Sequence, residues 1–531
     1  MNSANAAQEE LAPQAPKYRV DENPAYRGNP LIEALPPVPT KEEAYMALAL
    51  QPAPRVADFR SKDASSLIDL LGELQQVFVP TKMHIYALQK IVALVRTCYA
   101  YRDPNRPEVQ RALYSAARGR PALIGRLSPT GGGSNGMVLW GVTGSGKTSF
   151  IDRLVDYLGS LPIYHRLVQG GPSLWPQVPV LRIQCRKTLR GTSLALLEHL
   201  DKQLNSCHYG RVTDRLSRDL FLAKVQQAIS INFVGLLVIE DVHKLKDQAE
   251  VVLDYLCDIM EECGVPVLVV STYKFRKALM ADEAIASKLT ARGMIDFEPI
   301  PFSSALQSPA TPAPAPTETQ VGSPRAEGGV DATQPEEDDD DWVAFVEELF
   351  ELNLFRTAVE MPADLPRWLH FHAAGVRRFA REMLSVAFER SIRDASITNI
   401  TSPLLDDIAT NELQKYQEAV SVLRRRLVKA QISDADAAKF EHLIAPTDGL
   451  KNLKNEIRIR DLAEQAAAKP SGGPAVSAAA PVPAAKERAS EKAAAKKPRS
   501  TRAPSESPSA EAVYARLRAA GKLSRASNDA T

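Results

Sequence analysis

Apolar residues follow two different spacings in residues 135–302 of this 531-residue chain. Short, mostly apolar runs alternate with longer segments in which apolar residues stand three and four apart. The runs predict buried strands at Met137–Trp140, Val180–Ile183, Leu236–Ile239, Val267–Val270 and Met294–Phe297. The longer segments predict helices at Lys147–Leu158, Ser193–Leu204 and Ala249–Cys263. This alternation predicts an α/β fold, with a parallel sheet covered by helices on both faces.

The regions on either side of this core show only the helical spacing. Residues 41–125 carry it in DASSLIDLLGELQQVF and, after Pro80, in KMHIYALQKIVALVRTCYAY. After residue 341 it returns and predicts helices at Trp342–Leu354, Gly375–Ser391 and Leu404–Val428. We therefore expect a helical region ahead of the sheet and a small helical lid after it.

The remaining segments are poor in large apolar residues, so we expect them to be disordered, since they cannot bury enough surface to fold. The predicted organisation is an extended N-terminal arm (1–40), a helical region (41–125), the α/β core (126–302), an acidic and Pro-rich disordered insertion (303–341), a helical lid region (342–465), a basic disordered linker (466–508) and a short terminal helix (509–531). That last helix, on its flexible tether, is either a docking peptide for a partner protein or a frayed tail.

Charge and cysteine content narrow the class of protein only slightly. The net charge of +1 hides an acidic run at Glu336–Asp341 and a basic tail after Lys469, so it says little about nucleic acid. The five cysteines have no metal-like spacing. No apolar run approaches the ~20 residues of a membrane span, and the N-terminus lacks a signal pattern. We therefore expect a cytoplasmic protein with no membrane partner.

One segment after the first strand carries a phosphate-binding pattern. GVTGSGKT has the spacing G-x-x-x-x-G-K-T, in which glycines let the loop curl so that backbone N–H groups face phosphate oxygens at a helix N-terminus. Lys147 is expected to bridge the β- and γ-phosphates, and the Thr148 hydroxyl to bind Mg²⁺. An ordinary glycine-rich turn is the alternative. The predicted ATP-binding residues are Gly141, Val142, Thr143, Gly144, Ser145, Gly146, Lys147, Thr148 and Ser149.

The third predicted strand ends in two carboxylates, about a hundred residues after the loop. We expect Glu240 to lie on the Mg²⁺ side and Asp241 to activate the attacking water. Proteins of the P-loop class usually have Asp and then Glu at this strand end, and this chain has Glu and then Asp. Because Asp is one methylene shorter, the base sits back from the water, which predicts slow hydrolysis, with a turnover not far above ~1 s⁻¹. The alternative is a buried strand with a solvated acidic end.

Three weaker candidates follow from the same architecture. The fourth strand ends in a Ser-Thr pair, of which Thr272 would hold the attacking water, unless the pair only forms a turn. Past the next helix stand Lys288 and Arg292; in ring ATPases a basic residue here reaches the neighbouring subunit's γ-phosphate, and solvated surface charge is the alternative. At the start of a lid helix, Arg377 would either contact the phosphates or lie on the helix surface.

In their order, these segments resemble the AAA+ ATPases, with a P-loop, a carboxylate-ended strand, a polar strand end and a lid helix opening with Gly and Arg. Within that class, the chain resembles the transposition regulators of the TniB/TnsC type, relatives of the phage Mu target-selection ATPase. The resemblance covers about residues 25–305 and 342–430. It is carried by NPLIEALPPVP, FVPTKMHIYALQKI, STYKFRKAL and AAGVRRFAREMLSVAFERSIRDASITNITSPLL.

This resemblance implies a mechanism that the spacing alone does not. Proteins of this type assemble with ATP into rings or filaments on double-stranded DNA, recruit a transposase there, and come apart on ATP hydrolysis. For this chain it implies ATPase activity, a homo-oligomer, DNA binding without sequence preference, transposase and target-selector partners, and a place on the bacterial nucleoid. The Glu240–Asp241 order, Ser271 in the place of a glycine, and the insertion at 303–341 depart from the pattern.

The sequence offers one local candidate for DNA contact. Arg186, Lys187 and Arg190 follow the second predicted strand directly, and cations at such a place would bind phosphates of any sequence. A solvated loop is the alternative. Two other functions also stay open: a signalling or scaffold P-loop NTPase that switches protein partners, and an AAA+ remodeller similar to helicase loaders.

Overall fold

The computed structural model describes much of the first of the two units into which the chain divides, Met1–Gly449. The described residues are 16–51, 60, 62–118, 124–128, 135–166, 174–208, 217–242, 245, 248–302, 341–355, 359–427, 439, 440 and 443. Residues 303–340 of the insertion predicted at 303–341, the basic linker and the terminal helix lie outside these residues and stay predictions.

Five parallel strands form the central sheet, in the order β4-β5-β6-β1-β7. Their bounds are β1 Gly136–Gly141, β4 Val180–Gln184, β5 Leu236–Glu240, β6 Val267–Val270 and β7 Met294–Phe297. In register, Leu139 lies opposite Val270, and Glu240 pairs with Val270 from the other side. The carboxyl ends of β1, β5 and β6 therefore meet at one edge. The predicted fold class, a parallel sheet flanked by helices with a helical C-terminal region, is confirmed.

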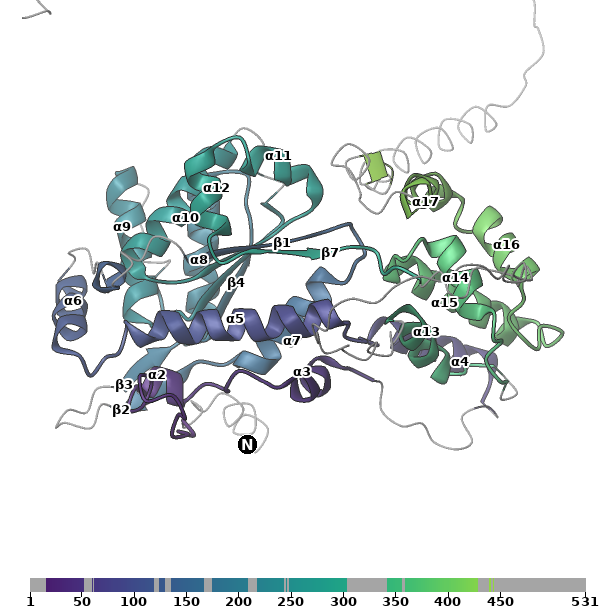
Figure 1. Ribbon diagram of the computed structural model, residues 1–531, viewed down its shortest axis with the longest axis horizontal. Coiled ribbons are helices and arrows are strands. Elements are labelled where there is room, and N and C mark those ends of the chain that lie inside the picture. Colours follow the sequence, from purple (N-terminus) through teal and green to yellow (C-terminus); the bar gives the residue numbers. More distant parts are fainter. Residues whose placement is uncertain are drawn as a thin grey trace, which may run out of the picture. The chain divides into compact units, whose positions relative to one another are not determined.

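Successive side chains of each strand enter two different cores, because strand side chains alternate between faces. Val238 packs with the helices on one face and its neighbour Ile239 with those on the other. Figure 1 shows α5 and α7 on one side of the sheet and α8, α10 and α12 on the other. Their bounds are α5 Lys82–Ala100, α7 Lys147–Leu158, α8 Leu189–Leu204, α10 Ala249–Cys263 and α12 Glu283–Thr290. Burial on both faces explains the uninterrupted apolar runs of β1, β5 and β6.

Polar caps set where several of these helices begin. The side chain of Thr188 accepts the N–H of Gly191 at the start of α8, and Asp282 accepts the N–H of Ile285 at the start of α12. The first of these caps begins α8 at Leu189, four residues before the predicted Ser193. The helical pattern of the sequence was right, and the position of the cap decided the boundary.

Polar contacts join the N-terminal arm to α5. The amide Nδ2 of Asn29 donates to the backbone oxygen of Tyr99 at 2.9 Å. Arg96 forms an ion pair with Asp21 and donates to the backbone oxygen of Pro36 at 3.1 Å. The short helices of this part are α2 Pro30–Glu33 and α3 Lys41–Leu48, and α6 Pro107–Ala117 follows α5. Further along, α4 Ala64–Asp69 and the 3₁₀ helix Leu70–Gln75 contact the lid helix α15.

Within the residues that the structure describes, the lid contains five helices. They are α13 Asp341–Glu351, α14 Leu365–Ala373, α15 Arg377–Arg393, α16 Ser402–Asn411 and α17 Gln414–Leu427. The single helix predicted at Leu404–Val428 is wrong, because the chain turns between α16 and α17. There the N–H groups of Glu412 and Leu413 both bond to the oxygen of Ile408. The turn lets α16 and α17 each pack on α14, which an unbroken helix cannot do.

The sequence pattern also missed a hairpin and a helix. Strands β2 Ile163–Arg166 and β3 Leu174–Gln177 pair antiparallel, and α9 Arg218–Ile231 packs against α8 and α10. Four-residue strands are too short for a clear alternation. Among the helices described, none combines the length and apolar character needed to cross a bilayer.

Candidate nucleotide site

The loop between β1 and α7 has the left-handed backbone that its glycines permit. Gly144 has φ of 92° and Gly146, which caps α7, has φ of 99°. From the first turn of α7, the Nζ of Lys147 reaches back and donates to the backbone oxygens of Gly141 and Val142, both at 2.8 Å. The loop therefore curls around the amino end of α7, as a phosphate cradle requires. Thr148 is exposed on that first turn.

The lid lies directly against this loop. The backbone N–H of Arg378 donates to the oxygen of Gly144 at 3.3 Å. A Cβ built on Gly144 would stand 2.9 Å from the Cβ of Arg378 and 3.1 Å from Cγ1 of Val376. Glycine is thus required at this position both by its backbone angle and by the close approach of the lid.

Arg377 is buried beside the loop with part of its guanidinium unsatisfied. It is 2% exposed, and within the described part of the chain neither Nη1 nor Nη2 has a hydrogen-bond partner. The rings of Phe78 and Phe345 lie 5.5 Å from its guanidinium carbon, and a Cβ built on Gly146 would lie 3.6 Å from Nη1. Burial and the nearby charge of Arg381 lower the pKa of Arg377 to about 9. An anion placed at the loop would supply the missing partner.

The predicted metal-side carboxylate forms an ion pair. Glu240 ends β5, is 7% exposed, and accepts a hydrogen bond at Oε2 from Nε of Arg182 at 2.7 Å. The other arm of that guanidinium binds Asp152 on α7. The carboxylate is therefore attached through Arg182 to the helix that opens with Lys147. Asp241 follows with φ of 59° and is half-buried, so the two predicted carboxylates stand in different environments.

The hydroxyls at the end of β6 also differ. Ser271 is 2% exposed, its N–H donates to the oxygen of Leu139, and its Oγ has no hydrogen-bond partner in the described residues. Thr272 is half-buried and precedes the 3₁₀ turn Tyr273–Phe275. The Oγ of Ser145, in the loop itself, is likewise buried without a described partner. Buried hydroxyls of this kind suit a polar ligand or water.

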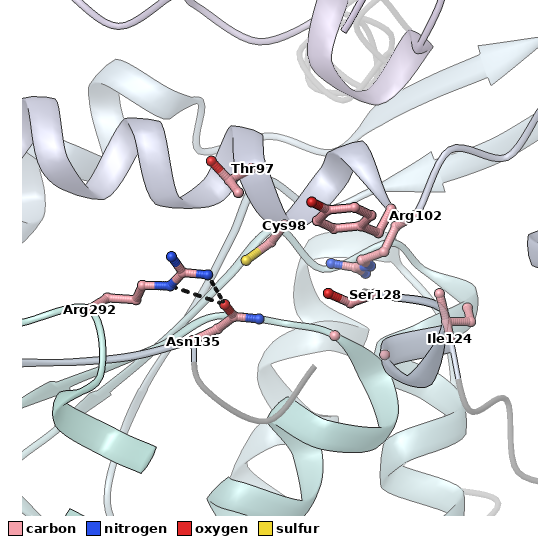
Figure 2. A pocket seen from close by; sticks show the side chains of 10 residues that line it. Thr97, Cys98, Arg102, Ile124, Ser128, Asn135 and Arg292 are labelled. Carbon is pink, nitrogen blue, oxygen red and sulfur yellow. Dashed lines mark hydrogen bonds between the residues drawn. The ribbon is translucent and has the colours of Figure 1, made fainter. Parts of the chain in front are cut away.

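Arg292 lies near the amino ends of the strands, at the opposite end of the sheet from the P-loop. Its N–H donates to the oxygen of Gly136, and its guanidinium donates to Oδ1 of Asn135 at 3.0 and 3.3 Å, as Figure 2 shows. Gly136 begins β1 and Gly141 ends it, which is roughly 16 Å of strand. Arg292 is therefore not brought to the P-loop of its own chain. Lys288, the other basic candidate, is paired with Glu261.

The three candidates for DNA contact follow β4 at the carboxyl edge. Arg186 and Lys187 are exposed, whereas Arg190 is half-buried, with its guanidinium carbon 5.0 Å from the centre of the Phe221 ring. Two of the three thus face solvent, and the third is partly occupied in packing.

Sequence patterns missed several residues of this site. Arg182 interrupts an otherwise apolar strand, VLRIQ, and such a half-buried cation is a usable signal for a carboxylate partner. Phe78 and Arg381 gave no such signal. Arg381 donates to the backbone oxygen of Val77 at 2.7 Å, and this contact across the chain joins the lid to the segment before α5.

One family model agrees with this geometry. Residues 132–279 match the family model described as an AAA domain. No curated relative matches the sequence. Among solved structures, the Aeropyrum pernix ORC1 protein in complex with DNA is 15% identical, with 63% of this chain and 80% of that chain covered and a TM-score of 0.31. The Drosophila ORC bound to DNA is 12% identical, with 64% and 85% covered and a TM-score of 0.29. Likenesses at these scores carry no argument about function.

Proposed function

We propose, on the premise that the chain contains an AAA+ P-loop domain, that it is an ATP-driven switch that assembles on double-stranded DNA and regulates transposition. The observation that carries the nucleotide-binding part is the buried guanidinium of Arg377, held beside Gly146 with two nitrogens unsatisfied. A triphosphate in the cradle would satisfy them, and so ligand binding would hold the lid in its place against the loop.

The residues present fit ATP with Mg²⁺. Gly141–Ser149 would surround the phosphates with backbone N–H groups, while Lys147 and Arg377 would supply positive charge from the helix and the lid. Thr148 and Glu240 are the oxygen donors suited to Mg²⁺, which when bound neutralises phosphate charge. For Glu240 to offer both carboxylate oxygens to Mg²⁺, Arg182 must first release Oε2.

We assign hydrolysis to residues at the carboxyl edge and to one residue from a second copy. Asp241 would take a proton from the attacking water, and Thr272 or its neighbour Ser271 would hold that water in place. Arg292 can act only on the nucleotide of a neighbouring copy, since it stands at the far edge of its own sheet. The reversed order of Glu240 and Asp241 supports slow turnover.

The DNA and transposition parts of the proposal rest on the sequence resemblance and on two exposed cations. Arg186 and Lys187 project after β4, where they would contact phosphates of any sequence. A homo-oligomer on DNA would repeat this pair along the duplex. The transposase and target-selector partners follow from the resemblance to the TniB/TnsC type alone.

Nucleotide titration with a fluorescent ATP analogue tests the first part. Arg377→Met should weaken binding at least tenfold, and Lys147→Ala more. Arg378→Met is the matched control, because its side chain is partly exposed and paired with Glu382, and it should change affinity less than twofold. Equal losses in both lid variants would count against a direct role of Arg377.

Electron microscopy and DNA binding with a non-hydrolysable analogue test the rest. We expect nucleotide-dependent rings or filaments on DNA, lost in Lys147→Ala and weakened for all DNA sequences in the double variant Arg186→Gln/Lys187→Gln. Assembly without any DNA affinity would favour a protein-switching NTPase. Assembly on DNA that leaves the activity of a transposase encoded beside the gene unchanged would favour a remodeller.

A further inference from the structure

A small cavity lies at the amino edge of the sheet, away from the nucleotide site. The described residues that line it include Cys98 on α5, Arg102 just after α5, Ser128, Asn135 and Arg292. Figure 2 shows Arg102 and Arg292 on opposite sides of the group, with Cys98 and Asn135 between them. The space available to the centre of a water-sized sphere is about 10 Å³, enough for one small occupant.

Arg102 reaches this cavity with donors that the described residues leave unsatisfied. It is 1% exposed, and its Nη1 donates to the backbone oxygen of Val234 at 2.6 Å. Its Nε and Nη2 have no hydrogen-bond partner in the described residues. Because a buried N–H without an acceptor costs free energy, this pair of donors indicates an occupant.

No carboxylate is found among the described residues that line the cavity, although two guanidinium groups reach it. The ionisable groups that act electrostatically on Arg102 are Tyr99, Cys98 and Cys263, and burial raises the pKa of each to about 12. These groups are therefore neutral at pH 7. The positive charge of Arg102 has no negative partner among the groups described around it, and an uncompensated buried charge is unfavourable.

Arg292 and Asn135 add a second cation and a further donor. The guanidinium of Arg292 donates to Oδ1 of Asn135, so the Nδ2 group of that amide is turned the other way, toward Ser128 and Arg102 (Figure 2). Both Arg102 and Arg292 act electrostatically on the thiol of Cys98, which places both charges near the same point.

We propose that this cavity binds one monatomic anion, chloride in the cell, between Arg102 and Arg292. Its size excludes phosphate and carboxylate ligands. A water molecule fits and accepts hydrogen bonds, but leaves the buried positive charge of Arg102 uncompensated, whereas a halide satisfies the Arg102 donors and offsets that charge. The anion would stabilise the edge of the sheet that carries Arg292. The site is separate from the nucleotide site and does not rest on the proposed function.

Chloride-35 line broadening of the full chain tests this site, with a saturating non-hydrolysable ATP analogue present so that the P-loop does not contribute. Excess linewidth should appear, be displaced by bromide, and fall at least threefold in Arg102→Met. Arg126→Met is the control, since Arg126 is an exposed arginine next to the cavity lining, and it should leave the linewidth unchanged. An unchanged linewidth in folded Arg102→Met overturns the proposal.

Crystals of the unaltered protein grown in bromide give a second measurement that does not depend on the folding of a variant. An anomalous peak between Arg102 and Arg292, together with displaceable linewidth in solution, supports the site. No peak there, or density that refines as water, overturns it. A peak without displaceable linewidth shows an adventitious ion only, and also overturns it.

Discussion

Arg182 on β4 holds the carboxylate of Glu240 on β5, with 2.7 Å between Nε and Oε2. The same guanidinium binds Asp152 on α7, the helix that begins at Lys147. The strand end and the nucleotide-binding helix are thus joined through one cation. A carboxylate engaged in this way is less available to a metal or to water.

Replacing this cation should therefore speed hydrolysis. We expect Arg182→Gln to raise the basal ATP turnover about tenfold, which corresponds to ~1.4 kcal/mol in the barrier, and to lower thermal stability because Glu240 loses its partner. Arg153→Gln is the matched control. Arg153 forms an ion pair with Asp156, both on α7, and this pair is more exposed than the pair of Arg182 with Glu240. Slower turnover with unchanged nucleotide affinity would show instead that Arg182 positions Glu240.

Nucleotide affinity should depend on pH through Arg377. Burial lowers the pKa of this arginine to about 9 in the nucleotide-free protein, and a bound triphosphate would raise it again. Binding then takes up a proton above pH 9, so affinity should fall about tenfold from pH 8 to pH 10. Calorimetric titration across this range measures it. The matched measurement on Arg377→Met should lack this component, and an equal pH dependence there would contradict the assignment.

The same pKa has a consequence for folding. Since the guanidinium binds its proton more weakly in the folded than in the unfolded chain, protonated Arg377 destabilises the nucleotide-free fold. The free energy of unfolding therefore gains from the deprotonation of Arg377 as pH rises through 9.

The contact of the lid with the loop predicts the effect of one glycine. Gly144→Ala combines φ of 92° with a Cβ 2.9 Å from that of Arg378, and should cost about 2 kcal/mol, or roughly 3 °C in the unfolding midpoint. Thermal unfolding of the full chain measures the shift. Gly72→Ala is the control, since nothing lies within 4 Å of a Cβ there. Equal midpoints for the two variants would mean that the lid moves away from the loop at little cost.

The two strand-end hydroxyls can be separated by mutation. The buried Oγ of Ser271, which lacks a partner in the described residues, is the better placed to hold a water, so Ser271→Ala should slow turnover roughly tenfold with nucleotide affinity unchanged. Thr272→Val should change turnover less than threefold. Steady-state kinetics of both variants decide the question, and the reverse order would restore Thr272 as the positioning hydroxyl.

Local patterns predicted the strands well because β1, β5 and β6 are buried on both faces and therefore read as unbroken apolar runs. Helix boundaries were less certain, since a polar cap such as Thr188 or a turn such as that at Leu413 outweighs the periodicity. The site divides in the same way. Its loop is contiguous in sequence, whereas the partners of Glu240 and the position of Arg377 depend on how separate elements pack.

By itself, the sequence determined the parallel α/β core, the curled loop at Gly141–Thr148 and the carboxylates at the end of β5, because spacing within one segment fixes each of them. Only the tertiary structure decided that Arg377 is buried beside Gly146, that Arg182 holds Glu240, and that Arg292 stands at the far edge. Some of these contacts join residues more than two hundred positions apart in the sequence. They are set by how the lid, the sheet and a helix pack together, and local spacing in the sequence does not encode that packing.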